Sequence, residues 1–114
     1  MEEKQMSQFP EQDWKLLRKK LPEWQEAAME QLCREYIGLL QKNEPASERF
    51  WTLEQRIRED RKRTGVVADM RRSNAELILL NLLSEQAITE ADLADFSEDT
   101  RDRVLTLLQF RNME

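Results

Sequence analysis

The side chains that could most readily do chemistry are the basic residues of one short stretch. Residues 56–73, RIREDRKRTGVVADMRRS, hold seven of the 18 Lys and Arg residues of a chain whose formal net charge is -5. Clustered guanidinium and ammonium groups bind phosphates or acidic protein surfaces. The stretch therefore predicts a contact site for such a partner, formed by six side chains: Arg58, Arg61, Lys62, Arg63, Arg71 and Arg72.

The same stretch also has a simpler interpretation. Glu54 precedes Arg58 by four residues, and Glu59 precedes Arg63 by four residues, which is the favourable order for ion pairs on a helix surface. Exposed pairs of this kind each stabilise a helix by only a few tenths of a kcal/mol. Because runs of charge are usually solvated, we favour this interpretation and keep the contact site as a hypothesis.

Nucleic acid is the second kind of partner to weigh. Single-stranded nucleic acid is held by aromatic side chains that stack on bases, and the chain has no aromatic residue between Ile57 and Phe96. The segment after Ser73, NAELILLNLL, shows Leu and Ile where a helix that reads a DNA groove needs polar side chains. A nucleic-acid-binding accessory protein that uses residues 56–72 is therefore our second hypothesis.

Enzymatic activity has little support in the residue types. The chain has no His and one Cys, which excludes Cys–His and Ser–His pairs and leaves a structural zinc site without its usual ligands. The one thiol, Cys33, falls on the apolar side of an expected helix, so we predict that it is packed like a small hydrophobic residue.

Carboxylates are the remaining catalytic candidates. Glu23, Glu26 and Glu30 share one helix face at spacings of three and four residues. Such a face could hold magnesium, as in all-helical nucleotide pyrophosphatases, and a magnesium-dependent nucleotide hydrolase is our third hypothesis. A hydrated acidic face is nevertheless what any soluble helix shows opposite its apolar stripe. We therefore expect no enzyme activity, no cofactor and no metal.

The composition indicates an all-helical protein. The 114 residues are 39% hydrophobic and 36% charged, with only two Gly and three Pro, so helix formers are plentiful and turn formers are scarce. This length suits one domain with one modest core. We predict an all-α fold, a compact bundle of four to five helices in a single domain over residues 10–114, after a flexible N-terminal arm, residues 1–9.

Apolar periodicity places the helices of the first half. Residues 11–20 form a short helix that ends before Pro22, because proline disfavours a helical backbone in the residue before it. Residues 22–42 then form a longer helix whose apolar stripe is broad enough to touch two neighbours, so we predict that this is the central helix.

A second long helix begins near Pro45 or Ser47 and runs into the basic stretch. Phe50, Leu53 and Ile57 mark its buried side. Its second half, REDRKRT, has no apolar residue, so we expect this end either to project from the molecule or to lie in solvent. Gly65 then ends the helix in the left-handed conformation.

Capping residues place the elements of the second half. Ser73 and Glu76 match a capping box, in which each side chain accepts a hydrogen bond from a backbone N–H group. Thr89 and Ser97 are the expected caps of a short helix and of the last helix. Residues 73–112 are therefore expected to form a helix, a short helix and a helix.

We expect neither a secretory signal nor a membrane span. The start, MEEKQMSQFPEQ, lacks a basic residue followed by an apolar run. The longest apolar run, residues 77–80, is far shorter than the roughly 20 residues that cross a bilayer. With its single Cys, the chain fits a cytoplasmic protein.

Four segments together resemble an uncharacterised family of small all-helical bacterial proteins with no assigned function. They are DWKLLRKKLPEWQEAAMEQLCREYIGLL, FWTLEQRIREDRKRTGV, RRSN and ITEADLADFSEDTRDRV. The resemblance covers nearly all of the chain after its first nine residues, and it implies no catalytic or ligand-binding residues.

These observations converge on a small cytosolic protein–protein interaction module, either regulatory or scaffolding. Its partner would be another protein, and a second copy of the chain is one candidate. In this hypothesis the expected free end of the second long helix, together with Arg71 and Arg72, contacts an acidic surface.

Overall fold

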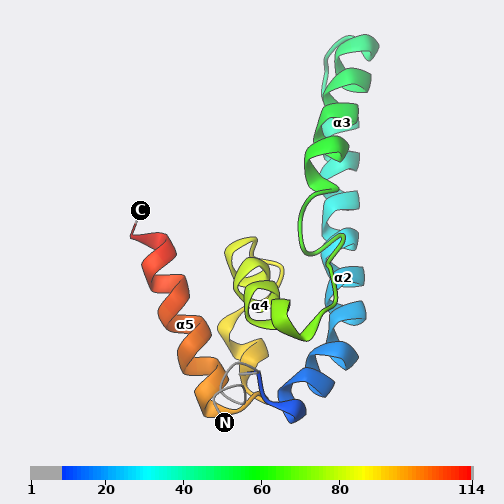
Figure 1. Ribbon diagram of the computed structural model, residues 1–114. Helices are drawn as coiled ribbons and strands as arrows, with labels where there is room; N and C mark the ends of the chain where they lie inside the picture. Colours follow the sequence, from blue (N-terminus) through cyan, green and yellow to red (C-terminus); the bar gives the residue numbers. More distant parts are fainter. Residues whose placement is uncertain (1–8, 114) are drawn as a thin grey trace.

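The computed structural model describes residues 9–113, and these residues form an all-α protein (Figure 1). The four α-helices are α2 (Glu11–Leu40), α3 (Ala46–Asp60), α4 (Ala75–Ser84) and α5 (Glu98–Asn112). Two short 3₁₀ helices, η1 (Arg72–Asn74) and η2 (Glu90–Leu93), stand before and after α4. No strand occurs in this part of the chain, and the predicted all-α bundle is confirmed.

The molecule is elongated. Its principal extents are 62 × 31 × 25 Å and its radius of gyration is 17.1 Å, compared with about 13 Å for a spherical domain of this length. The reason is visible in Figure 1: α4 lies between α5 and the first half of α2, whereas the second half of α2 runs with α3 far beyond them. We call this projecting helix pair, residues 27–60, the α2–α3 hairpin.

Helix α2 is continuous, so the predicted break before Pro22 is wrong. An internal proline costs roughly 3 kcal/mol, but packing on both sides of it holds the helix in register. Leu17 and Leu21 are buried before the proline, and Trp24 after it lies against the Phe96 ring, with 6.3 Å between ring centroids. Tertiary contacts thus override the local preference, and α2 bends between its first turns and the hairpin (Figure 1).

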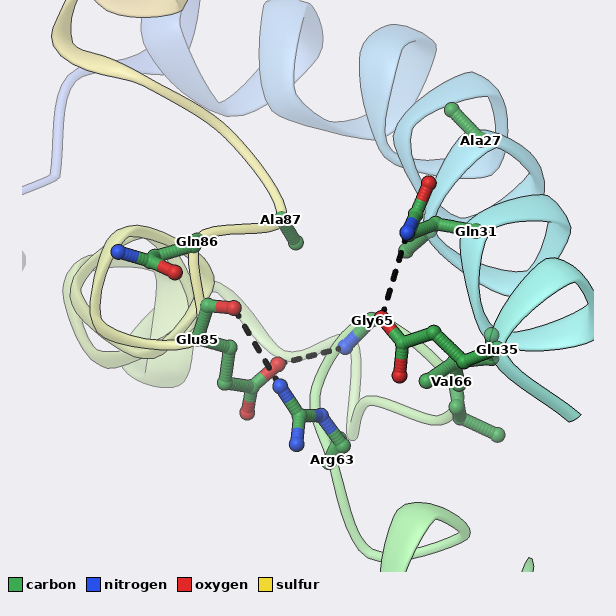
Figure 2. Close-up of a pocket in the computed structure, with 11 residues that line it drawn as sticks. Ala27, Gln31, Glu35, Arg63, Gly65, Val66, Glu85, Gln86 and Ala87 are labelled. Atoms are coloured by element: carbon green, nitrogen blue, oxygen red, sulfur yellow. Dashed lines mark hydrogen bonds between the residues drawn. The ribbon is translucent and has the colours of Figure 1, made fainter. Parts of the chain in front are cut away.

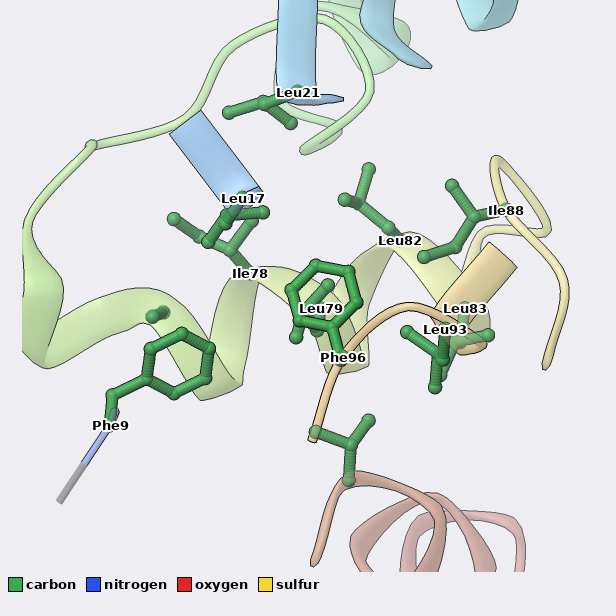
Figure 3. Packing of buried hydrophobic residues seen from close by; sticks show 12 residues of the cluster. Phe9, Leu17, Leu21, Ile78, Leu79, Leu82, Leu83, Ile88, Leu93 and Phe96 are labelled. Atoms are coloured by element: carbon green, nitrogen blue, oxygen red, sulfur yellow. The ribbon is translucent and has the colours of Figure 1, made fainter. Parts of the chain in front are cut away.

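The core lies between α4 and the elements on either side of it. Helix α4 is almost wholly apolar and buries six of its ten residues. Figure 3 shows Leu17 and Leu21 of α2 approaching α4 from one side and Phe96 approaching from another. The buried cluster comprises Phe9, Leu17, Leu21, Ala75, Ile78, Leu79, Leu82, Leu83, Ile88, Leu93, Phe96 and Val104.

The start of the described chain is fixed to the core. Phe9 is buried, and its carbonyl oxygen accepts hydrogen bonds from Arg72 Nε at 2.9 Å and Nη2 at 2.7 Å. The third nitrogen of Arg72 pairs with Glu11 at 2.7 Å. Phe9 therefore belongs to the folded domain and not to the expected flexible arm, whose other residues, 1–8, lie outside the described part.

Helix α5 is held at its N-terminus by a buried carboxylate. Asp13 of α2 accepts hydrogen bonds from the Ser97 backbone N–H at 3.0 Å and from the Ser97 and Thr100 hydroxyls at 2.6 Å each. Ser97 is the N-cap, as predicted, and accepts from the Thr100 backbone N–H. One acidic side chain thus joins the first helix to the last.

The predicted capping box at Ser73 is wrong. Ser73 lies inside η1, so it lacks the extended backbone of a cap residue, and α4 begins two residues later at Ala75. Glu76 pairs with Arg103 of α5 at 2.6 Å instead. A capping box does form at Thr89, whose backbone N–H donates to Asp92 at 2.8 Å.

No helix in the described residues is both long enough and apolar enough to span a bilayer.

Candidate interaction surface on the α2–α3 hairpin

The end of α3 that projects from the body is its beginning, whereas the sequence predicts that its basic end projects. The beginning of α3, next to the end of α2, lies at the far tip, and the end of α3 returns to the body of the molecule (Figure 1). At the tip, Arg49 donates to the Leu40 carbonyl oxygen at 2.8 Å and to the Glu44 carbonyl oxygen at 2.9 Å. The expectation that the basic end of the helix projects from the molecule is therefore wrong, although residues 61–63 there are exposed to solvent.

A polar network fastens α3 to α2. The Tyr36 hydroxyl donates to Asp60 at 2.5 Å, and Arg56 pairs with Glu35 at 2.8 Å and with Asp60 at 3.4 Å. The Arg56 guanidinium also stands 5.5 Å from the centroid of the Tyr36 ring. Burial, followed by the hydrogen bond to Asp60 and the charge of Asp60, raises the pKa of Tyr36 to about 12. The hairpin is thus a fixed unit and not two independent helices.

The root of the hairpin is clamped to the end of α4. Glu85 accepts a hydrogen bond from the backbone N–H group of Thr64 at 2.8 Å. It accepts a second one from the backbone N–H group of Gly65 at 3.1 Å (Figure 2). From α2, Gln25 donates to the Thr64 carbonyl oxygen at 2.9 Å. These contacts fix the direction in which the hairpin leaves the body.

Gly65 has a different role from the predicted one. Gly65 does not adopt a positive φ, so the left-handed helix end is wrong, and α3 stops at Asp60. A Cβ atom on Gly65 would instead stand 3.0 Å from the Cβ of Ala28. The glycine is needed because the returning chain passes so close to α2.

A pocket of about 360 Å³ lies beside this clamp, between α2, the returning chain and the end of α4 (Figure 2). Gln31 and Glu35 line it from α2, and Arg63 lines it from the opposite side. Its polar groups are largely engaged: Gln31 donates to Glu35 at 3.3 Å, and Arg63 donates to the Glu85 carbonyl oxygen at 3.3 Å.

The six basic residues singled out in the sequence have unequal surroundings. Arg72 holds the Phe9 carbonyl oxygen, as described above. Arg58 pairs with Glu54, Arg63 lies 3.7 Å from Asp60, and Arg71 lies 3.2 Å from Asp69. Within residues 9–113, the side chains of Arg61 and Lys62 have no hydrogen-bond or ion-pair partner, and both are exposed. Four of the six side chains are thus engaged inside the molecule, and two point to solvent.

Large apolar side chains cover much of the hairpin surface. Phe50 is 61% exposed, Trp51 63% and Ile37 55%, and Met29, Ile57 and Leu40 are each exposed by about 40%. The prediction that Phe50 and Ile57 are buried is therefore wrong, and Leu53 is only half-buried. Cys33 is exposed as well, contrary to its expected packing.

Helix geometry places most of these side chains on one side of the hairpin. On α2, residues 28, 32, 36 and 39 are at least half-buried along the α3 side, and on α3 residues 49, 53, 56 and 60 are their counterparts. One residue further along is a rotation of 100°. Because the two helices are antiparallel, the residues that directly follow the contact positions lie on the same side of the hairpin in both helices. The same rotation places Glu54 and Arg61 at the other two α3 positions of this side. We call its apolar members the apolar face: Met29, Cys33, Ile37, Leu40, Phe50 and Ile57.

The opposite side of the hairpin is polar. The residues directly before the contact positions are exposed. Their side chains are small, carry an amide group or are charged. Trp51 stands at the outer edge of α3 and packs edge-on against Phe50, with 4.9 Å between ring centroids. The polar side consists of Ala27, Gln31, Gly38, Glu48, Thr52, Gln55 and Glu59.

The acidic residues considered for magnesium are all exposed on α2: Glu23, Glu26 and Glu30. Glu30 lies 3.8 Å from Arg34. Within residues 9–113, no three potential metal-ligand side chains of the His, Cys, Asp and Glu types come together.

No family model, curated protein or solved structure matches the chain.

The sequence contains a pattern that reflects the apolar face but fits a buried central helix equally well. The apolar stripe of residues 22–42 is wider than one partner helix requires, and its width indicated a central helix with two neighbours. The structure provides one neighbour, α3, along the second half of α2. The part of the stripe that α3 does not cover is exposed and forms the α2 part of the apolar face.

Proposed function

We propose that this protein is a protein–protein interaction module that binds through the apolar face of the α2–α3 hairpin. The observation that carries the proposal is the exposure of Ile37 and Phe50, each more than half accessible, on one side of a helix pair whose other side is polar. Scattered apolar residues are normal on a protein surface, whereas a contiguous patch marks an interaction site.

The rigidity of the hairpin supports this proposal. The Tyr36–Asp60 contact fixes α3 on α2, and the Glu85 clamp fixes the hairpin on the body. A surface that is already ordered loses little conformational entropy on binding, so more of its contact energy appears as affinity. A large exposed aromatic pair, Phe50 and Trp51, is typical of the anchors of protein interfaces.

The basic residues have a secondary role in this proposal. Arg61 follows Ile57 by four residues and therefore stands at the edge of the apolar face, near the root of the hairpin. Together with Lys62 it would orient an acidic part of the partner. Phosphate binding by all six basic residues has less support, because Arg58, Arg63, Arg71 and Arg72 already have intramolecular partners. The proposal includes the reducing cytoplasm as the place of action, where an exposed thiol such as Cys33 persists.

The test is a pull-down from native lysate with matched variants. The face variant carries Ile37→Glu and Phe50→Glu, and the control carries Gly38→Glu and Thr52→Glu, which add the same charge on the polar side of the same helices. A Cβ atom on Gly38 would meet nothing within 4 Å, so the control leaves the packing intact.

We expect the wild type and the control to retain a protein partner after nuclease treatment, and the face variant to lose it. A third variant, Arg61→Gln with Lys62→Gln, is expected to weaken the same association and to make it less dependent on salt. Retention of every partner by the face variant would refute the proposal.

A further inference from the structure

We propose that the partner of the apolar face is a second copy of this chain, so that two hairpins pack into a symmetric four-helix bundle. This inference rests on the proposed function, since it uses the same face. It adds the identity of the occupant and the symmetry of the complex.

The shape of the apolar face favours a second copy of the same chain as the partner. A two-helix hairpin has only one interhelical contact, and apolar side chains remain exposed beside that contact on both helices, with Glu54 between Phe50 and Ile57 on α3. Two such hairpins placed face to face bury all four stripes, as in a four-helix bundle. A two-fold axis through the centre of the face brings identical surfaces together, which is the arrangement of most homodimers.

The ends of the face complement each other under this symmetry. The Arg49–Leu40 hydrogen bond places the start of α3 beside the end of α2, so Leu40 and Phe50 lie at the tip and Met29 lies near the root. A two-fold axis that lies in the interface, perpendicular to the helices and near Ile37 and Ile57, places Met29 of one copy against the Leu40 and Phe50 end of the other. A methionine thioether adapts to an uneven surface and packs well against an aromatic ring.

The charges of the hairpin permit self-association. Residues 27–60 contain 7 Asp and Glu and 5 Lys and Arg residues, so two hairpins repel each other only weakly. The charged residues next to the face are of both signs, Glu54 paired with Arg58, and Arg61. This surface has no strong electrostatic potential that would complement a highly basic or a highly acidic partner.

The size of the surface suits a small interface. The face follows α3, a helix of 15 residues, which is about 22 Å long, and it is two helices, or roughly 20 Å, wide. Its projected area is therefore about 440 Å² per copy, roughly half of the ~800 Å² of accessible surface that each partner buries in a standard-size complex, so we expect a weak dimer.

The test is sedimentation equilibrium of the purified full-length chain over about three decades of concentration, with the face variant and the matched control described above. We expect the wild type and the Gly38→Glu, Thr52→Glu control to form dimers. The Ile37→Glu, Phe50→Glu variant is expected to raise the dimer dissociation constant at least ~30-fold, which is the effect of losing one hot-spot residue.

Circular dichroism establishes that each variant is helical. If the double variant does not fold, Ile57→Gln, a single change on the same face, replaces it, with the same expected direction. A wild type that is monomeric throughout, or a dimer that survives the face substitutions, overturns the inference. In the first case the proposed function survives if the pull-down still shows a face-dependent protein partner; without one, both fail.

Discussion

Asp13 is the single residue on which the junction between the first and last helices most depends. Its carboxylate is buried and accepts three hydrogen bonds from Ser97 and Thr100. Burial alone would raise the pKa of Asp13, but these hydrogen bonds, aided by the charge of Arg101, outweigh burial and hold the pKa below its usual 3.8. The ionised form is therefore the one that the fold binds.

We predict that Asp13→Asn destabilises the protein by about 2 kcal/mol at pH 7, because the amide replaces a charged acceptor and places a donor among donors. The lowered pKa means that the unfolded state binds more protons between the two pKa values. The contribution of Asp13 is therefore complete above the unfolded pKa and is lost as the pH falls through the folded pKa. Urea unfolding at pH 7 and at pH 3 measures both effects.

The control for this prediction is Asp95→Asn. Asp95 is exposed and stands 3.7 Å from Lys20, so its loss should change the free energy of unfolding by less than ~0.5 kcal/mol. Equal effects of the two substitutions at pH 7 would show that Asp13 does not hold α5.

Tyr36 reports on the contact between α2 and α3. It is the one tyrosine in the chain, so absorbance at the phenolate band follows its ionisation alone. Burial and the hydrogen bond to Asp60 raise its pKa to about 12, so the stability that this contact adds is complete below pH 10 and is lost as the pH rises toward 12. We predict a titration midpoint well above 10 while the helices persist, and a lower midpoint in Asp60→Asn. An unshifted midpoint in the folded wild type would contradict the network.

At the scale of elements, the position of the hairpin depends on a close approach at its root. A Cβ atom on Gly65 would stand only 3.0 Å from the Cβ of Ala28, a tight contact, whereas Gly38 on the hairpin has open space around it. The same substitution is therefore expected to have opposite effects at the two positions.

We predict that Gly65→Ala destabilises the protein by about 1–2 kcal/mol, because the added methyl group forces the returning chain away from α2. Gly38→Ala is predicted to stabilise it by up to ~1 kcal/mol, since alanine is the better helix former and meets nothing there. Thermal unfolding of both variants, followed by circular dichroism, measures the two signs. Two changes of the same sign would be incompatible with this packing.

The helices were predictable from the sequence where local signals and tertiary packing agree. The Ser97 cap and the apolar residues of α4 led to the correct elements because the same residues form the core. Pro22 misled the prediction, since the burial of Leu17 and Leu21 outweighs a local penalty that cannot be compared with distant contacts from sequence alone. Ser73 misled it for a similar reason, because the neighbouring Arg72 is held by the Phe9 carbonyl oxygen and the chain takes a 3₁₀ turn there.

The candidate site was less predictable, because apolar periodicity does not reveal what covers an apolar stripe. Phe50 and Ile57 have the spacing of a buried face, and in this molecule they are exposed. The basic stretch drew attention through its charge, yet the partners of Arg63 and Arg72 lie 22 and 63 residues away in the chain. Only the folded structure distinguishes engaged arginines from those available to a partner.

At the scale of the whole molecule, a small core region carries a rigid hairpin that accounts for the elongated shape and a radius of gyration of 17.1 Å. The hairpin contributes little to the main core, whose buried residues come from other parts of the chain. Its outward position and its one-sided apolar surface are the features on which the proposed interaction rests.

The measurement that tests this account most directly is the alkylation rate of Cys33, the one thiol in the chain, which is exposed on the apolar face. It is compared between living cells and dilute purified protein, with a Cys33→Ser, Gln55→Cys variant as a control that carries its thiol on the polar side. We predict that Cys33 is protected in cells and reacts readily when the protein is dilute, whereas the control thiol reacts in both. A Cys33 that is alkylated in cells as fast as the control thiol would contradict the claim that a protein partner covers the apolar face.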